Sequence, residues 1–240
     1  PPFRIDRARA KLAENRDLLD EVERKLGVQS NFIVALWGIE TDFGRITGGF
    51  KVIQALATLA FDARRAKYFR RELLAALQIL DEGHIAVKDM VGSWAGAMGQ
   101  AQLMPTSFVA YAIDFDGDGR RDVWNSKADV FGSAANFLKT EGWLSGETWG
   151  YEVRLPDGFD AQVLGLKVTK PVAEWQAMGV RLVGGGDLSD PGYEVSVLLP
   201  DQDAARAFLV MENFRNILKW NRSNNFALAV GFLADAIEAQ

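Results

Sequence analysis

One glutamate ends a long apolar run, in the segment Asn31-Phe-Ile-Val-Ala-Leu-Trp-Gly-Ile-Glu40-Thr-Asp-Phe-Gly44, where residues 32–39 carry no polar side chain. In a helix, one stripe would hold Ile33, Leu36, Trp37 and Glu40. A helix that is apolar all round is normally buried, so we expect Glu40 to be partly buried. Desolvation then raises the pKa of its carboxyl group, as a general acid requires. The alternative is that Glu40 only caps or salt-bridges a structural element.

A second segment, Gly92-Ser-Trp-Ala-Gly-Ala-Met-Gly-Gln-Ala-Gln-Leu-Met-Pro105, combines glycines with neutral polar and flat apolar side chains. The glycines at 92, 96 and 99 leave room for another segment or a ligand beside the backbone. Hydrogen-bonding groups without charge come from Ser93, Gln100 and Gln102, and apolar contact comes from Trp94 and Met98. This combination suits a sugar better than a phosphate. A glycine-rich packing loop is the alternative.

A third segment, Asp114-Phe-Asp-Gly-Asp-Gly-Arg-Arg-Asp-Val-Trp-Asn125, has the spacing of a calcium-binding EF-hand loop. Loop positions 1, 3 and 5 are Asp114, Asp116 and Asp118, and Arg120 would supply the carbonyl of position 7. Position 12 is Asn125 instead of glutamate, so we expect Asp129 to supply the missing carboxylate. A structural Ca²⁺ is predicted. A solvated acidic turn is the alternative, and a lone loop makes a calcium sensor less plausible.

The elements that must position these segments are mostly helices, expected over residues 5–26, 51–62, 65–82, 105–113, 127–141, 212–220 and 223–238. Ser30 or Asn31 would cap the helix that carries Glu40. Residues 151–155, 162–168 and 193–199 alternate as strands do. We therefore predict a mainly α (α+β) fold: a helical body, residues 1–148 and 212–240, with a small β-containing lobe, residues 149–211.

Composition narrows the function classes. The 240 residues include no cysteine, which excludes disulfides, thiolate nucleophiles and Cys-ligated metals. The net charge of −5, with no basic run longer than the pairs Arg64-Arg65 and Arg70-Arg71 and their flanking residues, disfavours a nucleic-acid partner. The single histidine, His84, makes neither a triad nor a zinc site and is expected on a solvated loop. No apolar stretch is long enough to span a bilayer, and the N-terminus lacks a signal peptide, so we expect a mature or trimmed start.

Together, these motifs resemble the lytic transglycosylases of bacterial cell walls, in particular the membrane-bound lytic transglycosylase B family and its soluble relatives. The resemblance covers nearly the whole chain, from Ala35–Gly44 through the glycine-rich and acidic segments to Asn221–Val230. It implies a lysozyme-like helical fold, a periplasmic or cell-envelope location and peptidoglycan strands as the partner. It also implies no organic cofactor. We expect a monomer, with membrane anchoring only through a segment absent from this chain.

The resemblance also implies a chemistry and a set of site residues. Glu40 would protonate the glycosidic oxygen between N-acetylmuramic acid and N-acetylglucosamine, then accept the proton of the muramyl C6 hydroxyl as a 1,6-anhydro ring closes. Polar contacts to the glycan would come from Ser93, Gln102 and Asn221. Relatives often have tyrosine where this chain has Phe137 and Trp220, so these positions would keep a stacking face but lose a hydroxyl.

Two other functions are compatible with the same residues. A hydrolytic muramidase would need a second carboxylate, and Asp42 is the nearest candidate. At a helix end, however, residues i and i+2 point apart. A peptidoglycan-binding module without catalysis would have no need for a buried acid at position 40.

Overall fold

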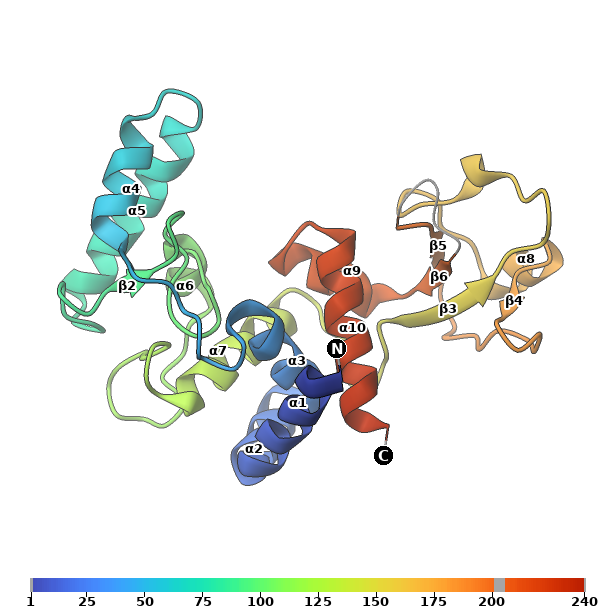
Figure 1. The fold of residues 1–240 in the computed structure, drawn as a ribbon, viewed down its shortest axis with the longest axis horizontal. Helices are drawn as coiled ribbons and strands as arrows, with labels where there is room; N and C mark the ends of the chain where they lie inside the picture. The colour runs from blue at the N-terminus through green and yellow to red at the C-terminus, as the bar shows by residue number, and fades with distance from the viewer. Residues whose placement is uncertain (1, 201–205, 240) are drawn as a thin grey trace. The chain divides into compact units, whose positions relative to one another are not determined.

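The computed structural model describes residues 2–200 and 206–239, and their fold is mainly helical with small antiparallel sheets, as expected from the sequence (Figure 1). Its contacts divide the chain into two compact units: residues 1–141 with 232–240, and residues 142–231. Compared with the expected lobe at 149–211, the second unit also holds residues 142–148 and 212–231. Among the described residues, no helix has both the length and the apolar composition needed to cross a membrane.

In the first unit, the core is built around α3 (Ser30–Thr41), which is buried over most of its length. Helices α1 (Pro2–Glu14), α2 (Arg16–Leu26) and α7 (Lys127–Thr140) pack against it. Gly27 ends α2 in the left-handed conformation, which glycine adopts without strain. The apolar run before Glu40 therefore forms the central helix of this unit.

The chain then makes an excursion through a helical hairpin, α4 (Val52–Phe61) and α5 (Ala66–Asp81), whose helices lie side by side (Figure 1). The excursion starts and ends at a two-stranded antiparallel ladder of β1 (Phe50–Lys51) and β2 (Val91–Gly92). Helix α6 (Pro105–Tyr111) starts with proline at its first position and packs against α5. The ladder thus joins the segment after Glu40 to the glycine-rich segment.

In the second unit, a four-stranded antiparallel sheet has the order β4 (Arg181–Leu182), β3 (Gly150–Arg154), β6 (Ala207–Val210), β5 (Ser196–Leu198). Its apolar core includes the fully buried Trp175 of α8 (Val172–Ala177), whose indole N–H donates to the carbonyl of Val195 (3.0 Å). Helix α9 (Glu212–Trp220) follows the sheet, and α10 (Asn224–Glu238) spans the boundary between the units.

Three expectations about elements were wrong. The helix expected over 5–26 is broken at Asn15, whose side chain donates to the carbonyl of Lys11 (2.7 Å). Ser30 is the first residue of α3, not its cap. Residues 162–168 form no strand: a 3₁₀ turn at Ala161–Val163 is followed by Gly165, whose φ of +107° interrupts an extended path.

Candidate functional site

Glu40 lies in the last turn of α3 and is partly buried, as the apolar run predicted. The turn is fixed to the glycine-rich segment through Thr41, which is 1% exposed. The Thr41 hydroxyl donates to the carbonyl of Gln100 (2.7 Å) and accepts from the backbone N–H of Gly44 (3.0 Å). The Gln100 side chain in turn accepts from the indole N–H of Trp37 (2.9 Å). The backbone beside Glu40 is therefore held from both sides.

After Thr41 the backbone turns back sharply through three left-handed residues: Asp42 (φ +50°), Phe43 (φ +61°) and Gly44 (φ +79°). This conformation is uncommon for a bulky residue such as Phe43. It is stabilised by packing, since the Phe43 ring lies edge-on to Trp37 with 5.5 Å between ring centroids. Gly44 permits a close approach, because a Cβ there would lie 2.2 Å from Oε1 of Gln100. Strained backbone of this kind is found most often at functional sites.

The hydrogen bonds of Thr41 to Gln100 and Gly44, which we call the clamp, should contribute measurably to stability, and replacing Thr41 with valine tests this. Thr41→Val keeps the shape but leaves the Gln100 carbonyl and the Gly44 N–H without their partner. We expect a loss of about 2 kcal/mol in unfolding free energy by urea titration. The same change at the exposed Thr58, whose hydroxyl donates to the carbonyl of Gln54 in its own helix, is the control and should cost less than about 0.5 kcal/mol. Equal losses at both positions would refute the clamp.

The glycines of the second segment serve packing, which was the alternative left open by the sequence. A Cβ at Gly92 would lie 2.1 Å from the carbonyl oxygen of Ala97, and one at Gly99 2.4 Å from that of Val123. Both approaches are made by the chain's own backbone. Met98 is fully buried and cannot contact a ligand, whereas Trp94 is 64% exposed. Trp94 lines a cavity of ≈ 350 Å³ together with Phe50, Gln54 and Thr58.

The neutral polar residues of this segment also have partners within the protein. Ser93 is partly buried, and its hydroxyl accepts from the N–H of Ala97 (3.0 Å). The side-chain amide of Gln102 donates to the carbonyls of Thr47 and Gly99, both at 3.0 Å, and its backbone is left-handed (φ +52°). Both side chains therefore shape the loop next to the α3 terminus, whether or not they also contact a glycan.

The other three expected glycan contacts lie in different surroundings. Phe137, on α7, is only 6% exposed and packs against the ring of Tyr111 (centroids 4.5 Å apart), so little of its face is open for stacking. Trp220 and Asn221 belong to the second unit, at the end of α9. Trp220 is partly buried, and the exposed Asn221 accepts from the N–H of Ser223 through its side-chain oxygen (3.1 Å).

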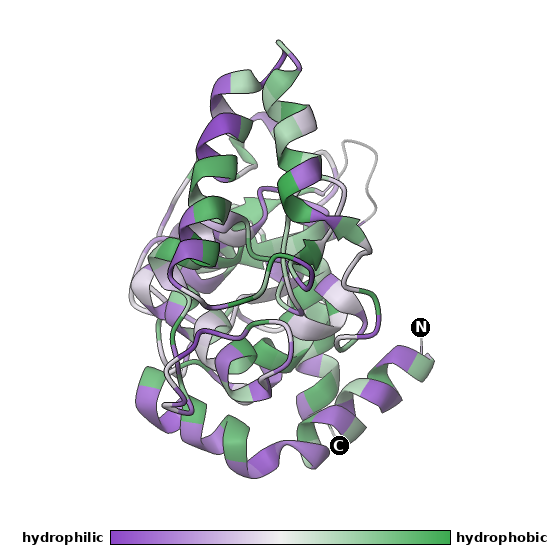
Figure 2. Ribbon diagram, turned by 90° about the vertical axis from the view of Figure 1, so that its left-hand side faces the viewer, coloured by the Kyte–Doolittle hydropathy of each residue, from purple (hydrophilic) through white to green (hydrophobic). Residues whose placement is uncertain are grey.

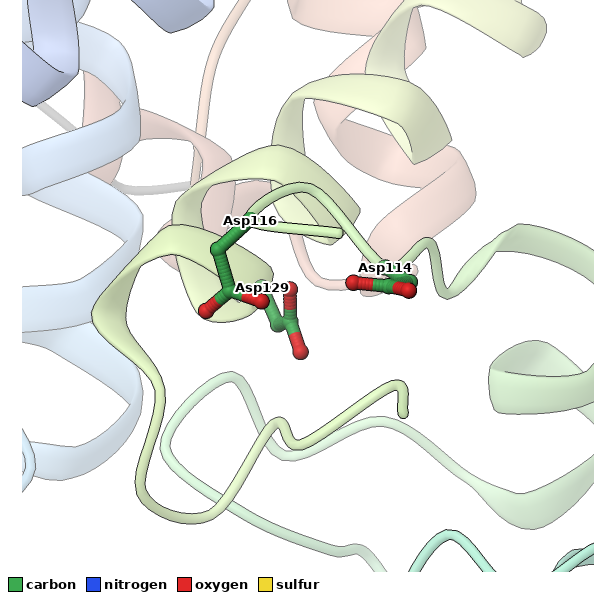
Figure 3. Close-up of side chains that lie close together, drawn as sticks. All are labelled: Asp114, Asp116 and Asp129. Carbon is green, nitrogen blue, oxygen red and sulfur yellow. The ribbon is translucent and has the colours of Figure 1, made fainter. Parts of the chain in front are cut away.

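The acidic segment brings three carboxylates together, with Asp114 and Asp116 on the loop and Asp129 on α7 (Figure 3). One oxygen of each lies within 4.8 Å of the others, so the triad could hold a metal ion. Backbone N–H groups hold the loop in shape: Asp114 accepts from Gly117 (2.7 Å) and Gly119 (2.8 Å). Asp129 is buried, and burial together with the two neighbouring carboxylates raises its pKa despite two backbone N–H bonds.

Asp118, the fourth predicted carboxylate ligand, is not in this cluster. The Asp118 carboxylate accepts from the N–H of Arg120 (2.8 Å) within the loop. At loop position 12, the Asn125 side chain donates to Asp122 (3.0 Å). The geometry therefore favours one part of the calcium-loop hypothesis most: Asp129 takes the place of the glutamate that usually occupies loop position 12.

Two further polar side chains, His84 and Glu72, lie in surroundings that differ from what the sequence indicated. His84 is not on a solvated loop: it accepts from the Arg121 side chain (2.9 Å) and lies beside the Phe108 ring (centroids 5.7 Å apart).

Glu72 is fully buried on α5, and both carboxylate oxygens accept from Thr106, at the start of α6 (2.9 Å each). A lone glutamate on the apolar stripe of Phe69, Ala76 and Ile79 was the available signal. With both oxygens engaged, Glu72 is structural and does not rival Glu40.

Comparison with known proteins gives a consistent result. The chain is 33% identical to membrane-bound lytic murein transglycosylase B of Escherichia coli over 234 residues, which are 92% of this chain and 60% of the relative. SltB3 from Pseudomonas aeruginosa, solved in complex with NAG-anhNAM-pentapeptide, matches all of this chain and 64% of its own length, with 48% identity and a TM-score of 0.96. E. coli Slt35, solved in complex with calcium, matches 99% of this chain and 75% of its own length, with 30% identity and a TM-score of 0.87.

The first relatives are thus longer proteins, of which this chain spans less than two thirds. The fold they share with it runs from end to end, and the resemblance inferred from the three motifs is confirmed. The sequence profile of the transglycosylase SLT domain extends over residues 1–235. With α3, the glycine-rich segment and the acidic loop all inside that match, the chain belongs to the transglycosylase SLT domain family.

Proposed function

We propose that this chain is a peptidoglycan lytic transglycosylase that cleaves the β-1,4 bond between N-acetylmuramic acid and N-acetylglucosamine without consuming water. The observation that carries the proposal is Glu40, partly buried at the end of the central helix and followed by a clamped, strained turn. Its relatives are lytic transglycosylases, one of them solved with NAG-anhNAM-pentapeptide. A fixed acid at a strained turn is a typical arrangement for catalysis.

In this mechanism Glu40 acts twice. As an acid, it protonates the glycosidic oxygen, so that the bond to muramyl C1 breaks and N-acetylglucosamine leaves with a free C4 hydroxyl. As a base, it then takes the proton of the muramyl C6 hydroxyl, whose oxygen bonds to C1 and closes the 1,6-anhydro ring. The proton returns to Glu40 and no water enters. One carboxyl group is sufficient because the substrate supplies the nucleophile.

The position of Asp42 supports this scheme over hydrolysis. Arg7 donates through Nη1 to both oxygens of the Asp42 carboxylate, at 2.6 Å each, and Arg45 donates to the same carboxylate at 2.8 Å. Two cations therefore engage the carboxylate that a muramidase would use to activate water. We further propose that the exposed Trp94 stacks on a sugar, with Ser93 and Gln102 of the same unit as polar contacts. For Trp220 and Asn221, which belong to the second unit, we propose a stacking and a polar contact to the glycan, respectively. For Phe137 we propose packing beneath the site, because its ring is covered.

A structural calcium ion is proposed at Asp114, Asp116 and Asp129, with Asp118 and the Arg120 carbonyl completing the ligand set. The close packing of the triad and the calcium complex of Slt35 support it. The ion would join the loop to α7 and leave the chemistry to Glu40. The proposed setting is the bacterial cell envelope, with the chain acting as a monomer on glycan strands.

The test of the reaction type is the mass of the products. We expect digestion of purified peptidoglycan to release muropeptides lighter by one water than those of a muramidase digest, as read by mass spectrometry. Reduction with borohydride supplies the control, because anhydro ends resist it and reducing ends do not. Reducing-end products would establish hydrolysis, and binding without release would establish a binding module.

A further inference from the structure

The α4–α5 hairpin ends in a strongly basic tip that the proposed chemistry does not use. Residues 61–74 contain five cations, all exposed, against two carboxylates. The local net charge of +3 contrasts with −5 for the whole chain. The cations are Arg64, Arg65, Lys67, Arg70 and Arg71, and we call residues 61–74 the hairpin tip. Figures 1 and 2 show the hairpin extending from its unit, with the connection between α4 and α5 at the far end.

Neighbouring acids neutralise only part of this charge. Arg64 pairs with Asp62 (2.7 Å), and Arg71 lies 3.6 Å from the buried Glu72. Among the described residues, the other three cations form no ion pair. Tyr68 instead orders two guanidinium groups, with Arg65 at 4.4 Å and Arg71 at 5.6 Å from its ring centroid. These side chains line an open hollow of ≈ 670 Å³ together with Lys67, Arg70 and Leu74.

The position of the cations on the helix is unfavourable for folding alone. Lys67 lies in the first turn of α5, where no acidic residue is present, and Arg65 is at the N-cap without a side-chain cap. A helix N-terminus is already positive, so cations there destabilise it. Sequences that break a local rule without a visible structural gain often do so for function. A bound anionic partner would neutralise these cations and so remove the destabilisation of the α5 N-terminus.

The apolar side chains of the tip identify the kind of partner. Phe61 ends α4 with 93% of its surface exposed, and Leu74 on α5 is 62% exposed. A soluble polyanion needs the cations but not these side chains, whereas basic and large apolar residues together are typical of segments that lie in a lipid interface. We propose that the hairpin tip docks on an anionic phospholipid surface, with Phe61 entering the interface and the cations contacting headgroups. This inference does not depend on the proposed reaction.

The test is flotation of the purified chain with vesicles of phosphatidylcholine, with or without phosphatidylglycerol. We expect binding only to the anionic vesicles, weakening as salt is added. The triple variant Arg65→Gln, Lys67→Gln, Arg70→Gln should bind about a hundredfold more weakly. Phe61→Ser, at a site too exposed to affect folding, should weaken binding about tenfold. The matched control removes three exposed cations elsewhere, Lys88→Gln, Arg154→Gln and Lys167→Gln, and should bind as the unchanged chain does.

Because the chain has no cysteine, one introduced thiol reports the contact directly. Ala63→Cys, labelled with an environment-sensitive dye, should shift to the blue on anionic vesicles, while labelled Lys167→Cys should not. Equal binding by the triple variant and its control would overturn the proposal. Binding to inorganic polyphosphate but to neither vesicle would also overturn it, since the tip would then be a site for soluble polyanions.

Discussion

Glu40→Gln should reduce the release of anhydro-muropeptides by at least about a hundredfold, the contribution expected of a general acid and base. Glutamine keeps the shape of the side chain and one acceptor oxygen but can neither give nor take the proton. Because the bond from Thr41 to Gln100 and the packing of Phe43 against Trp37 hold the turn, the fold should be unchanged. Release is measured by mass spectrometry of digested peptidoglycan, and folding by circular dichroism.

Asp42→Asn is the matched control for this substitution. Asparagine tolerates the left-handed backbone at position 42, and only the charge facing Arg7 and Arg45 is lost. This variant should retain most of its activity and release the same anhydro products. If Asp42→Asn is as inactive as Glu40→Gln, the single-carboxyl mechanism is wrong and a two-carboxylate scheme takes its place.

Calcium should raise the midpoint of thermal unfolding by roughly 5–10 °C when it is present at about a hundredfold excess over its Kd. The physical reason is the triad, in which Asp129 is buried beside two further carboxylates whose repulsion the ion would neutralise. Differential scanning calorimetry with calcium, and again after chelation, measures the shift. Magnesium at the same concentration is the comparison, because its octahedral geometry suits this loop poorly.

Asp116→Asn separates the role of the ion from that of the loop. The amide keeps the oxygen that accepts from the N–H of Asp118 (3.3 Å) but removes one charge from the triad. The variant should lose the calcium shift and, without calcium, be at least as stable as the parent chain. A calcium shift that survives in Asp116→Asn would place the ion elsewhere, and a loss of stability without calcium would make the aspartate structural by itself.

Much of the helical architecture could be predicted from local patterns. The apolar run gave α3, and the amphipathic stripes gave α4, α5, α7, α9 and α10 to within a few residues. The start of α3 was missed because the side chain that accepts hydrogen bonds from its first residue belongs to another helix. The backbone N–H and hydroxyl of Ser30 both donate to Glu23 on α2 (2.9 and 2.8 Å). A cap provided by a neighbouring helix leaves no local signal.

The sheet was predicted less well, for a different reason. Strand β6 was missed because its four residues, Ala207–Val210, are buried on both faces between β3 and β5 and so show no alternation. Residues 162–168 alternate without forming a strand, because Gly165 turns the backbone and bonds to the carbonyl of Val197 (2.7 Å). An alternating sequence pattern indicates that one side of a segment is covered, and it does so whether or not that segment forms a strand.

In the candidate site, the identity of the chemically important residues was easier to predict than the contacts that each residue makes. Glu40 and the acidic triad follow from patterns in which the chemistry determines the residue. The clamp at Thr41 could not be anticipated, because its bond to Gln100 spans 59 positions of sequence. Met98 and Phe137 look like ligand-facing residues in the sequence, but the fold covers both.

The ladder of β1 and β2 brings the two ends of the segment from Val52 to Met90 side by side, since the N–H of Val52 donates to the carbonyl of Met90 (3.1 Å). A segment whose ends already meet behaves as a cassette: it can be lengthened, shortened or exchanged without rerouting the rest of the chain. Any exchanged cassette would have to keep the bonds that tie it to the rest of its unit, among them those from Thr106 to Glu72 and from Arg121 to His84. The hairpin tip could therefore diversify between relatives while the helix that carries Glu40 stays unchanged.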